Sequence, residues 1–336
     1  MTATSDSQPI IGEAPAFLEM LEHVSRAAPL SKPVLVVGER GTGKELIASR
    51  LHFLSERWEQ PFVKVNCAAL TESILESELF GHEAGAFTGA AKTHIGHFER
   101  ASGGTLILDE LATISLRMQE KILRTIEYGE IQRVGGSDTL RVDVRIVGST
   151  NADLQSLAAE GQFRKDLLDR LAFDVVTVPP LRDRVEDILP LANAFAINMA
   201  SELKWSYFAG FSPRASSALL RNRWPGNVRE LKNTVERSVY RASDPEQPIT
   251  QLALDPFDSP FKLAGEKVSE PKTVKSRRSP LLPTNLPERL LELETDLLEA
   301  ALEKSRFNQR VAAELLGLSY HQFRGRLKKF DIRGKP

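Results

Sequence analysis

The chain contains very little cysteine and no long apolar run. Its single cysteine, Cys67, excludes an intrachain disulfide and is typical of a reducing compartment. No segment approaches the roughly 18 apolar residues that cross a bilayer. The first ten residues, MTATSDSQPI, lack the apolar stretch of a signal peptide. We therefore expect a cytoplasmic protein without direct membrane insertion.

A strong net charge of either sign is also missing. The 336 residues carry a formal net charge of −1, so the whole chain indicates no class of partner. The exception is residues 304–336, which hold nine Lys or Arg and two acidic residues. This local excess of positive charge predicts contact with nucleic acid at one end of the chain.

Short apolar runs predict the fold class. They lie at residues 34–37, 62–65, 106–108, 144–147 and 175–178, and helical segments separate most of them. Because the runs are continuously apolar rather than alternating, they favour strands that are buried on both faces. We therefore expect an α/β fold with a parallel sheet.

The length of the chain allows more than one domain. The strand pattern predicts an α/β domain over residues 1–180, and helical patterns predict a smaller domain over 181–254. Residues 255–286 are rich in Pro, Ser and Lys, which is typical of a flexible linker. Helices resume over 287–336 and predict a further domain.

Residues 38–45, GERGTGKE, match the phosphate-binding loop G-x-x-x-x-G-K between a strand and a helix. The glycines let backbone N–H groups face phosphates, and Lys44 adds a positive charge. Glu45 stands where the motif has the Ser or Thr whose hydroxyl binds Mg²⁺. A direct bond to the metal is therefore not expected from this position, and a contact through water is the alternative. A Gly-rich turn with a surface lysine is the alternative. The predicted nucleotide-binding residues of this segment are Gly38, Glu39, Arg40, Gly41, Thr42, Gly43, Lys44 and Glu45.

The segment GGTLILDEL ends an apolar strand with Asp109 and Glu110. Ligands of parallel sheets bind at the carboxyl ends of the strands. Asp109 is predicted to bind Mg²⁺, and Glu110 is predicted to polarise the attacking water. The alternative is a pair of acids that begins the next helix. Together with Lys44, the pair favours ATP hydrolysis over nucleotide sensing alone.

Polar residues end two neighbouring strands as well. One strand ends with Thr150 and Asn151. The side-chain amide of Asn151 contacts either the γ-phosphate or the attacking water in one interpretation, and caps a helix in the other. Asn66 leaves the same two alternatives, and in the first it hydrogen-bonds Glu110.

Three arginines are candidates for contact with the γ-phosphate. Arg164 and Arg170 precede the fifth strand, and such arginines often come from a neighbouring subunit. Arg229 lies in the helical domain and is a candidate for contact from the lid side. Ion pairs within the chain are the alternative for all three.

Four segments together resemble the AAA+ domain of bacterial enhancer-binding proteins, the activators of sigma-54 RNA polymerase. These segments are GERGTGKE, ESELFGHEAGAFTGA, GGTLILDE and RWPGNVREL, and the resemblance covers roughly residues 10–245. It implies a P-loop NTPase with a helical lid, ATP and Mg²⁺ as cofactors, and a ring, usually a hexamer. It further implies that Asn66 is a switch, that Arg164 and Arg170 act on the neighbouring subunit, and that Arg229 is a lid sensor. Glu45 is tolerated in this family.

The hexapeptide GAFTGA is highly specific to that family. Without the resemblance, Phe87 would be an aromatic residue of a flexible turn, packed on its own domain. The resemblance implies instead a loop, hinged by two glycines, that contacts the sigma-54 RNA polymerase holoenzyme. The segment VGGSDTLRV resembles a second loop of the ring pore, although a β-turn fits it equally well. The predicted sigma-54 contacts are Gly85, Ala86, Phe87, Thr88, Gly89 and Ala90.

The last segment predicts a helix-turn-helix. Apolar Val311, Ala312, Leu315 and Leu316 precede Gly317, and a basic helix follows. By resemblance this is a Fis-type domain that dimerises on enhancer double-stranded DNA. A basic helix docked on its own core is the alternative. The predicted DNA-binding residues are Tyr320, His321, Gln322, Arg324, Arg326 and Lys328.

RLHFLSERW and the C-terminal tail resemble the phage-shock branch of the family. This implies that Trp58 contacts phage shock protein A, a negative regulator, whereas the alternative is a tryptophan that covers the core. Because the matched region starts near residue 10, we expect no receiver domain ahead of it. The expected function is a sigma-54-dependent activator of a phage-shock operon. A nucleotide-sensing DNA-binding repressor is the alternative, and GAFTGA disfavours a DNA-unwinding replication protein.

Overall fold

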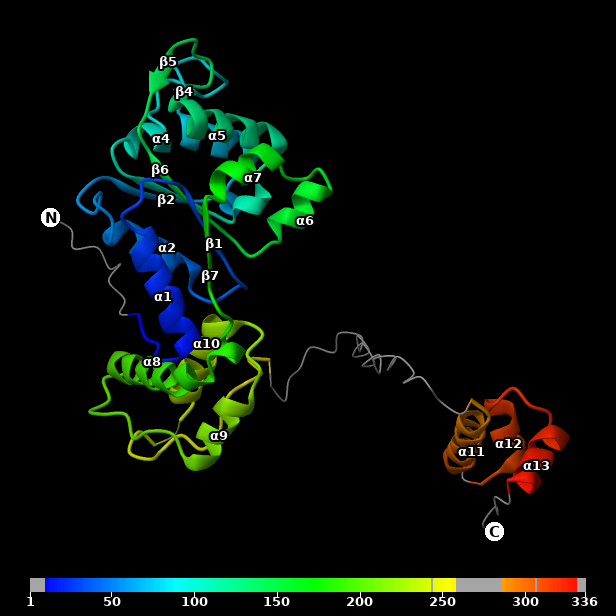
Figure 1. Ribbon diagram of the computed structural model, residues 1–336. Coiled ribbons are helices and arrows are strands. Elements are labelled where there is room, and N and C mark those ends of the chain that lie inside the picture. Colours follow the sequence, from blue (N-terminus) through cyan, green and yellow to red (C-terminus); the bar gives the residue numbers. More distant parts are fainter. Residues whose placement is uncertain (1–9, 243, 258–285, 306, 331–336) are drawn as a thin grey trace. The chain divides into compact units, whose positions relative to one another are not determined.

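The computed structural model describes residues 10–242, 244–257, 286–305 and 307–330 (Figure 1). Contacts divide the chain into two units, residues 1–258 and 259–336. Residues 258–285, which make up most of the predicted linker, lie outside the described residues.

The first unit is built on a five-stranded parallel sheet with the strand order β2-β3-β6-β1-β7. The α/β prediction is confirmed, because every predicted apolar run lies on one of these strands. Polar residues occupy matching ends, since Asn66 on β2 lies opposite Asp109 on β3. The strands are β1 (Val34–Val37), β2 (Phe62–Asn66), β3 (Thr105–Asp109), β6 (Arg145–Thr150) and β7 (Asp174–Thr177).

Helices cover both faces of the sheet (Figure 1). On one face, α1 (Pro15–Ala27) and α2 (Lys44–Phe53) pack their apolar sides on β1, β6 and β7. On the other face lie α3 (Glu72–Phe80), α5 (Leu116–Tyr128) and α7 (Lys165–Leu171). The short helices α4 (His97–Arg100) and α6 (Leu154–Ala159) complete this layer. The central strands β3, β6 and β1 are therefore buried on both faces, whereas the edge strands β2 and β7 are partly exposed.

Two insertions interrupt the layer formed by α3, α4 and α5. One is the segment between α3 and α4, which carries GAFTGA. The other is a hairpin of β4 (Glu130–Gln132) and β5 (Thr139–Arg141), which pair antiparallel beyond the end of α5. The strand β4 was not predicted from the sequence.

A helical lid completes the first unit. It consists of α8 (Ile188–Glu202), α9 (Pro213–Arg221) and α10 (Asn227–Tyr240). On α10, Leu231, Val235 and Val239 recur at helical spacing and are fully buried against α8 and α9. Burying one such side chain contributes roughly 1.5–3 kcal/mol, so this stripe holds the lid together.

The described residues of the second unit form a small domain of three helices, which are α11 (Leu286–Lys304), α12 (Gln309–Leu315) and α13 (Tyr320–Lys329). Gly317 turns the chain between α12 and α13 with a φ of 65°. On α12, Ala312 and Ala313 are buried in the core of the unit, whereas Val311 and Leu315 are exposed. Across the described part of the chain, no helix has both the length and the apolarity needed to span a membrane.

Candidate active site

The phosphate-binding loop joins β1 to α2 at the carboxyl edge of the sheet. Gly43 caps α2 with a φ of 99°, and Gly41 has a φ of 81°. Both values favour glycine, and a Cβ on Gly41 would lie 2.3 Å from the carbonyl oxygen of Gly226 in the lid. The glycines of the motif thus permit both the turn and a close approach of the lid.

A pocket of about 320 Å³ lies over this loop, between the sheet and the lid. One part is apolar, where Ile11, Phe17 and Phe195 are among the lining residues. The other part is charged and suits phosphates and a cation. Its charged lining residues are Arg40, Lys44, Glu45, Asp109, Glu110, Arg184, Arg229 and Lys232.

Lys44 is nearly buried at the floor of the pocket. Its ammonium group donates hydrogen bonds to the carbonyl oxygens of Gly38 (3.0 Å) and Glu39 (3.2 Å). Burial lowers the pKa of Lys44, while the carboxylates of Glu110 and Asp109 act in the opposite direction. These carboxylates therefore favour the charged form that a phosphate would meet.

Asp109 and Glu110 lie beside Lys44 at the end of β3. The Asp109 carboxylate accepts a hydrogen bond from the hydroxyl of Ser149 on β6, which orients one of its oxygens. Glu110 has a left-handed backbone, with a φ of 53° and a ψ of 43°. Such strain costs roughly 1–3 kcal/mol and clusters at active sites. An oriented carboxylate that faces a phosphate pocket fits the oxygen ligands that Mg²⁺ prefers.

The lid contacts the phosphate-binding loop through residues that the sequence analysis missed. Arg182 donates two hydrogen bonds to the Glu39 carboxylate, at 2.8 and 2.6 Å. Asn227 donates to the same carboxylate (3.1 Å) and to the carbonyl oxygen of Arg40 (3.1 Å). Arg182, and after it Asn227, lower the pKa of Glu39 to about 2. Asn227 lies inside the RWPGNVREL segment, which was the available signal.

Arg184 is a second missed residue, and it is almost completely buried. Its guanidinium donates to the carbonyl oxygen of Thr42 (2.9 Å) and lies 4.7 Å from the centre of the Phe17 ring. Arg229 lines the pocket from α10, and its backbone N–H donates to the carbonyl oxygen of Gly41 (3.3 Å). Within the described residues its side chain has no ion pair, so the predicted alternative of a helix salt bridge is not observed.

Asn66, Thr150 and Asn151 do not line this pocket. The Asn66 side chain accepts a hydrogen bond from the N–H of Ala68 (2.9 Å), which is the capping alternative rather than a bond to Glu110. Thr150 is buried, and its hydroxyl accepts from the N–H of Ala152 (3.0 Å). The capping alternative for Asn151 is wrong, because Asp153 caps α6.

Arg164 and Arg170 also lie outside the pocket of their own chain. Arg164 precedes α7 and pairs with Asp166 at 2.7 Å. Arg170 on α7 pairs with Glu127 at 3.0 Å and is 60% exposed. Both are engaged in ion pairs within the chain, and neither lines the pocket over the phosphate-binding loop.

The GAFTGA segment is a loop stabilised by its own backbone. Gly85 and Gly89 have φ values of 84° and 107°, and the N–H of Gly85 donates to the carbonyl oxygen of Ala90 (2.8 Å). The Phe87 side chain is 48% exposed, and its ring meets the edge of His82 at 4.9 Å between centroids. The ring thus packs on His82 of its own domain on one side and leaves about half of the residue exposed to solvent.

The hairpin beyond α5 adjoins this loop. Arg133 pairs with Glu83 (2.7 Å) and with Glu99 (2.7 Å), and a Cβ on Gly135 would overlap Ala86 at 2.6 Å. The two insertions therefore form one connected surface.

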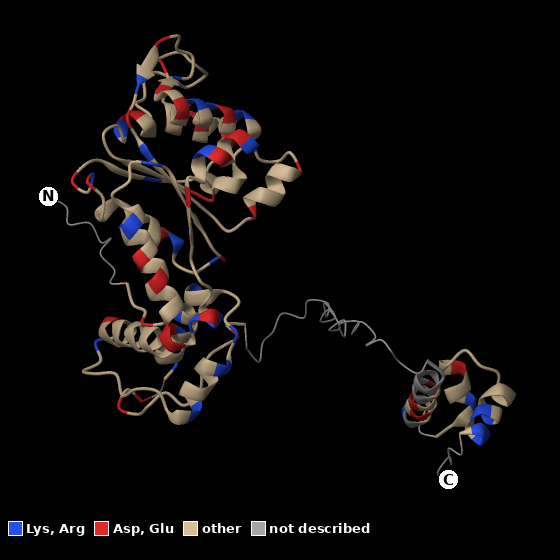
Figure 2. Ribbon diagram, viewed as in Figure 1, with Lys and Arg blue, Asp and Glu red and all other residues tan. Residues whose placement is uncertain are grey.

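The predicted DNA-binding residues all lie on α13, but two have partners inside the unit. Gln322 is part of a capping box, in which its side chain accepts from the N–H of Ser319 (3.0 Å). Arg326 pairs with Glu294 of α11. The positive charge of this unit gathers on α13 (Figure 2). The predicted base contact of Gln322 thus competes with its role at the helix start.

These features define an AAA+ ATPase joined to a helix-turn-helix domain, and comparison with known families agrees. Residues 10–177 match the Sigma-54 interaction domain, residues 182–259 match the AAA+ ATPase lid domain, and residues 289–330 match the Fis family of bacterial regulatory proteins. The chain belongs to the sigma-54-dependent activators, which bind ATP, hydrolyse it and carry a DNA-binding domain.

The relatives are consistent with this assignment. The Psp operon transcriptional activator of Escherichia coli K12 is 58% identical over 323 residues, covering 96% of this chain and 98% of that protein. The Nif-specific regulatory protein of Azotobacter vinelandii is 42% identical and covers 96% of this chain and 59% of that protein. Among solved structures, NtrX of Brucella abortus in complex with ATP has a TM-score of 0.68 at 33% identity, covering 98% of this chain and 71% of NtrX.

Proposed function

We propose that this chain converts the closed complex of sigma-54 RNA polymerase into an open complex at a phage-shock operon. ATP hydrolysis supplies the energy, and the GAFTGA loop transmits it to sigma-54. The similarity to the Psp operon activator supports the choice of operon.

The observation that carries this proposal is the path of the chain between the nucleotide site and the loop. The GAFTGA loop is inserted between β2 and β3, the two strands whose adjacent ends hold Asn66 and Asp109. A shift at these ends reaches the loop through α3, which directly precedes it. Glycines at both hinges let the loop move without deforming the domain.

In this mechanism, four charged residues of the pocket act on the nucleotide, the metal ion or the attacking water. Asp109, with its carboxylate oriented by Ser149, would hold Mg²⁺, which supplies positive charge to the phosphates. Glu110 accepts the proton of the attacking water, and its strained backbone directs the carboxylate into the pocket. Lys44 and Arg229 stabilise the negative charge of the phosphates from the floor and from the lid.

The proposed active form is a ring, with six subunits as the expected number. The exposed side chain of Arg170, together with Arg164, would then reach the γ-phosphate of the neighbouring subunit. The second unit binds enhancer DNA, which in a bacterium lies in the cytoplasm.

Promoter opening in vitro tests the proposal. The purified full chain, ATP and sigma-54 holoenzyme are incubated with a sigma-54 promoter, and melted DNA is detected with permanganate. We expect opening with ATP and none with a non-hydrolysable analogue. Binding of DNA with no phosphate release would instead favour the nucleotide-sensing repressor.

Trp58 is proposed as the contact for phage shock protein A. Its side chain is 57% exposed at the end of a segment that also exposes Phe53 and Leu54. An exposed aromatic side chain of this size is typical of a binding hot spot. Replacing Trp58 with Ala is expected to abolish inhibition of the ATPase by purified phage shock protein A and to leave basal hydrolysis unchanged.

The control for this variant is Tyr240→Ala, which removes an aromatic ring that is 68% exposed on the lid. Inhibition should persist in that variant. Full inhibition of Trp58→Ala would refute the assignment.

A further inference from the structure

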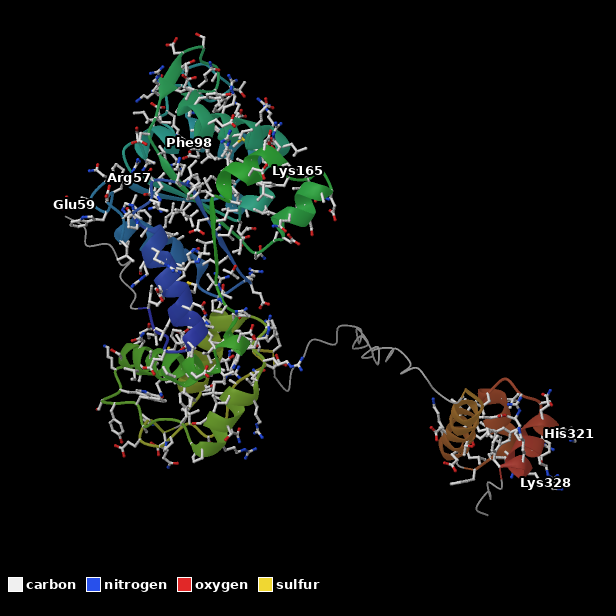
Figure 3. All side chains as sticks on the ribbon, in the orientation of Figure 1. Arg57, Glu59, Phe98, Lys165, His321 and Lys328 are labelled. Carbon is white, nitrogen blue, oxygen red and sulfur yellow. The ribbon has the colours of Figure 1, made fainter. Side chains whose placement is uncertain are left out.

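A glycine occupies the middle of the outward face of α13. Phe323 and Leu327 of this helix are buried in the core of the second unit, with exposed fractions of 0% and 5%. At 100° per residue, Gly325 points almost directly away from these two side chains. His321 is one turn before it and Lys328 is nearly one turn after it, and both extend away from the helical core (Figure 3).

The fold of the unit does not require this glycine. Gly325 is not among the residues with a positive φ, so its backbone suits any helix-forming residue. A Cβ built on it meets no heavy atom within 4 Å, so no neighbour needs the space. Except for proline, glycine is the least favourable residue in a helix interior. The unit therefore carries a destabilising residue for which its own packing gives no reason.

The residues around Gly325 indicate why a glycine stands at this position. Glycine is used where a backbone must approach a ligand closely. Arg324, Lys328 and Lys329 flank the position, and they match the charge of a phosphate backbone. Within the part of the chain that the structure describes, Arg324 and Lys328 have no polar partner, whereas Gln322 and Arg326 do.

We infer that α13 makes its closest approach to double-stranded DNA at Gly325, where the helix backbone itself lies against the DNA. His321 precedes this contact by one turn, Arg324 directly precedes it, and Lys328 follows it by nearly one turn. The inference deepens the proposed enhancer binding, since it depends on α13 being the helix that enters the groove. A side chain at residue 325 would hold the helix away from the DNA and weaken every contact around it.

The test uses the full chain with two variants, Gly325→Ala and Gly325→Leu. Both new residues are good helix formers, so a merely structural glycine and a contact glycine give opposite results. Affinity is measured by fluorescence anisotropy with a duplex that the wild-type chain has selected from a random-sequence pool. Helix stability is measured by hydrogen exchange of α13 peptides.

We expect slower exchange in α13 for both variants, together with weaker binding. The affinity should fall roughly tenfold for Ala, the size of one lost base contact, and further for Leu. The matched control is Ala300→Leu, at an exposed position of α11, which should bind as the wild type does.

Two outcomes would overturn the inference. One is wild-type affinity in both variants, and the other is faster exchange in α13, because the fold would then need the glycine. If the wild-type chain selects no sequence from the pool, the proposed enhancer binding fails as well, so the two failures are distinguishable.

Discussion

Replacing Glu110 with Gln is expected to leave ATP bound while hydrolysis falls by about a hundred- to ten-thousand-fold, the usual contribution of a general base. The amide fills the same space but cannot accept a proton from the attacking water. Lys44 and Asp109 stay in place, so the affinity for ATP should change little. Nucleotide binding is measured with a fluorescent ATP analogue and hydrolysis by phosphate release.

The control is Glu202→Gln, which removes an exposed carboxylate at the end of α8. Its hydrolysis should equal that of the wild type. Wild-type hydrolysis by Glu110→Gln would show that another group activates the water. Loss of ATP binding would place Glu110 among the groups that hold the nucleotide.

Replacing Phe87 with Ala is expected to abolish promoter opening and to preserve ATP hydrolysis within about twofold. The ring does not line the nucleotide pocket, and its exposed half is free to meet a partner. Removing an aromatic residue from a binding hot spot costs about 2 kcal/mol or more, which corresponds to roughly 30-fold in affinity for sigma-54. Permanganate footprinting and phosphate release measure the two activities in parallel.

Phe257→Ala provides the matched control, since Phe257 is an 81% exposed phenylalanine at the far end of the same unit. That variant should open promoters normally. Phe87→Tyr keeps the ring and should retain part of the activity. Complete promoter opening by Phe87→Ala would rule out the GAFTGA loop as the sigma-54 contact.

The sequence predicts those parts of the molecule that depend on local patterns. Apolar runs identify every strand of the parallel sheet, because strands that helices cover on both sides are made mostly of apolar residues. The glycines of GERGTGKE are recognisable because the phosphate loop requires them at fixed spacing. Asp109 and Glu110 are recognisable because they follow an apolar strand at the edge of the sheet where ligands bind.

Contacts between distant segments were not predictable in the same way. Arg182 and Arg184 look like surface charges in the sequence, and only the packing of the lid brings them to Glu39 and Thr42. The part that Gln322 plays in the capping box of α13 was also not predicted, because the residues around it are basic. A Ser three residues before a Gln is a recognised helix start, but the basic helix around it suggested DNA instead.

The interlock between Gly41 and Gly226 couples the orientation of the lid to the hold on nucleotide. Because no atom fits between the two backbones, a rotation of the lid toward the loop has to displace the loop that surrounds the phosphates. Coupling between two binding sites is reciprocal. If ATP binding favours one orientation of the lid, a partner that binds the lid in that orientation raises the affinity for ATP. Surfaces of α8 and α9 that never touch nucleotide are therefore places from which the ATPase cycle can be governed.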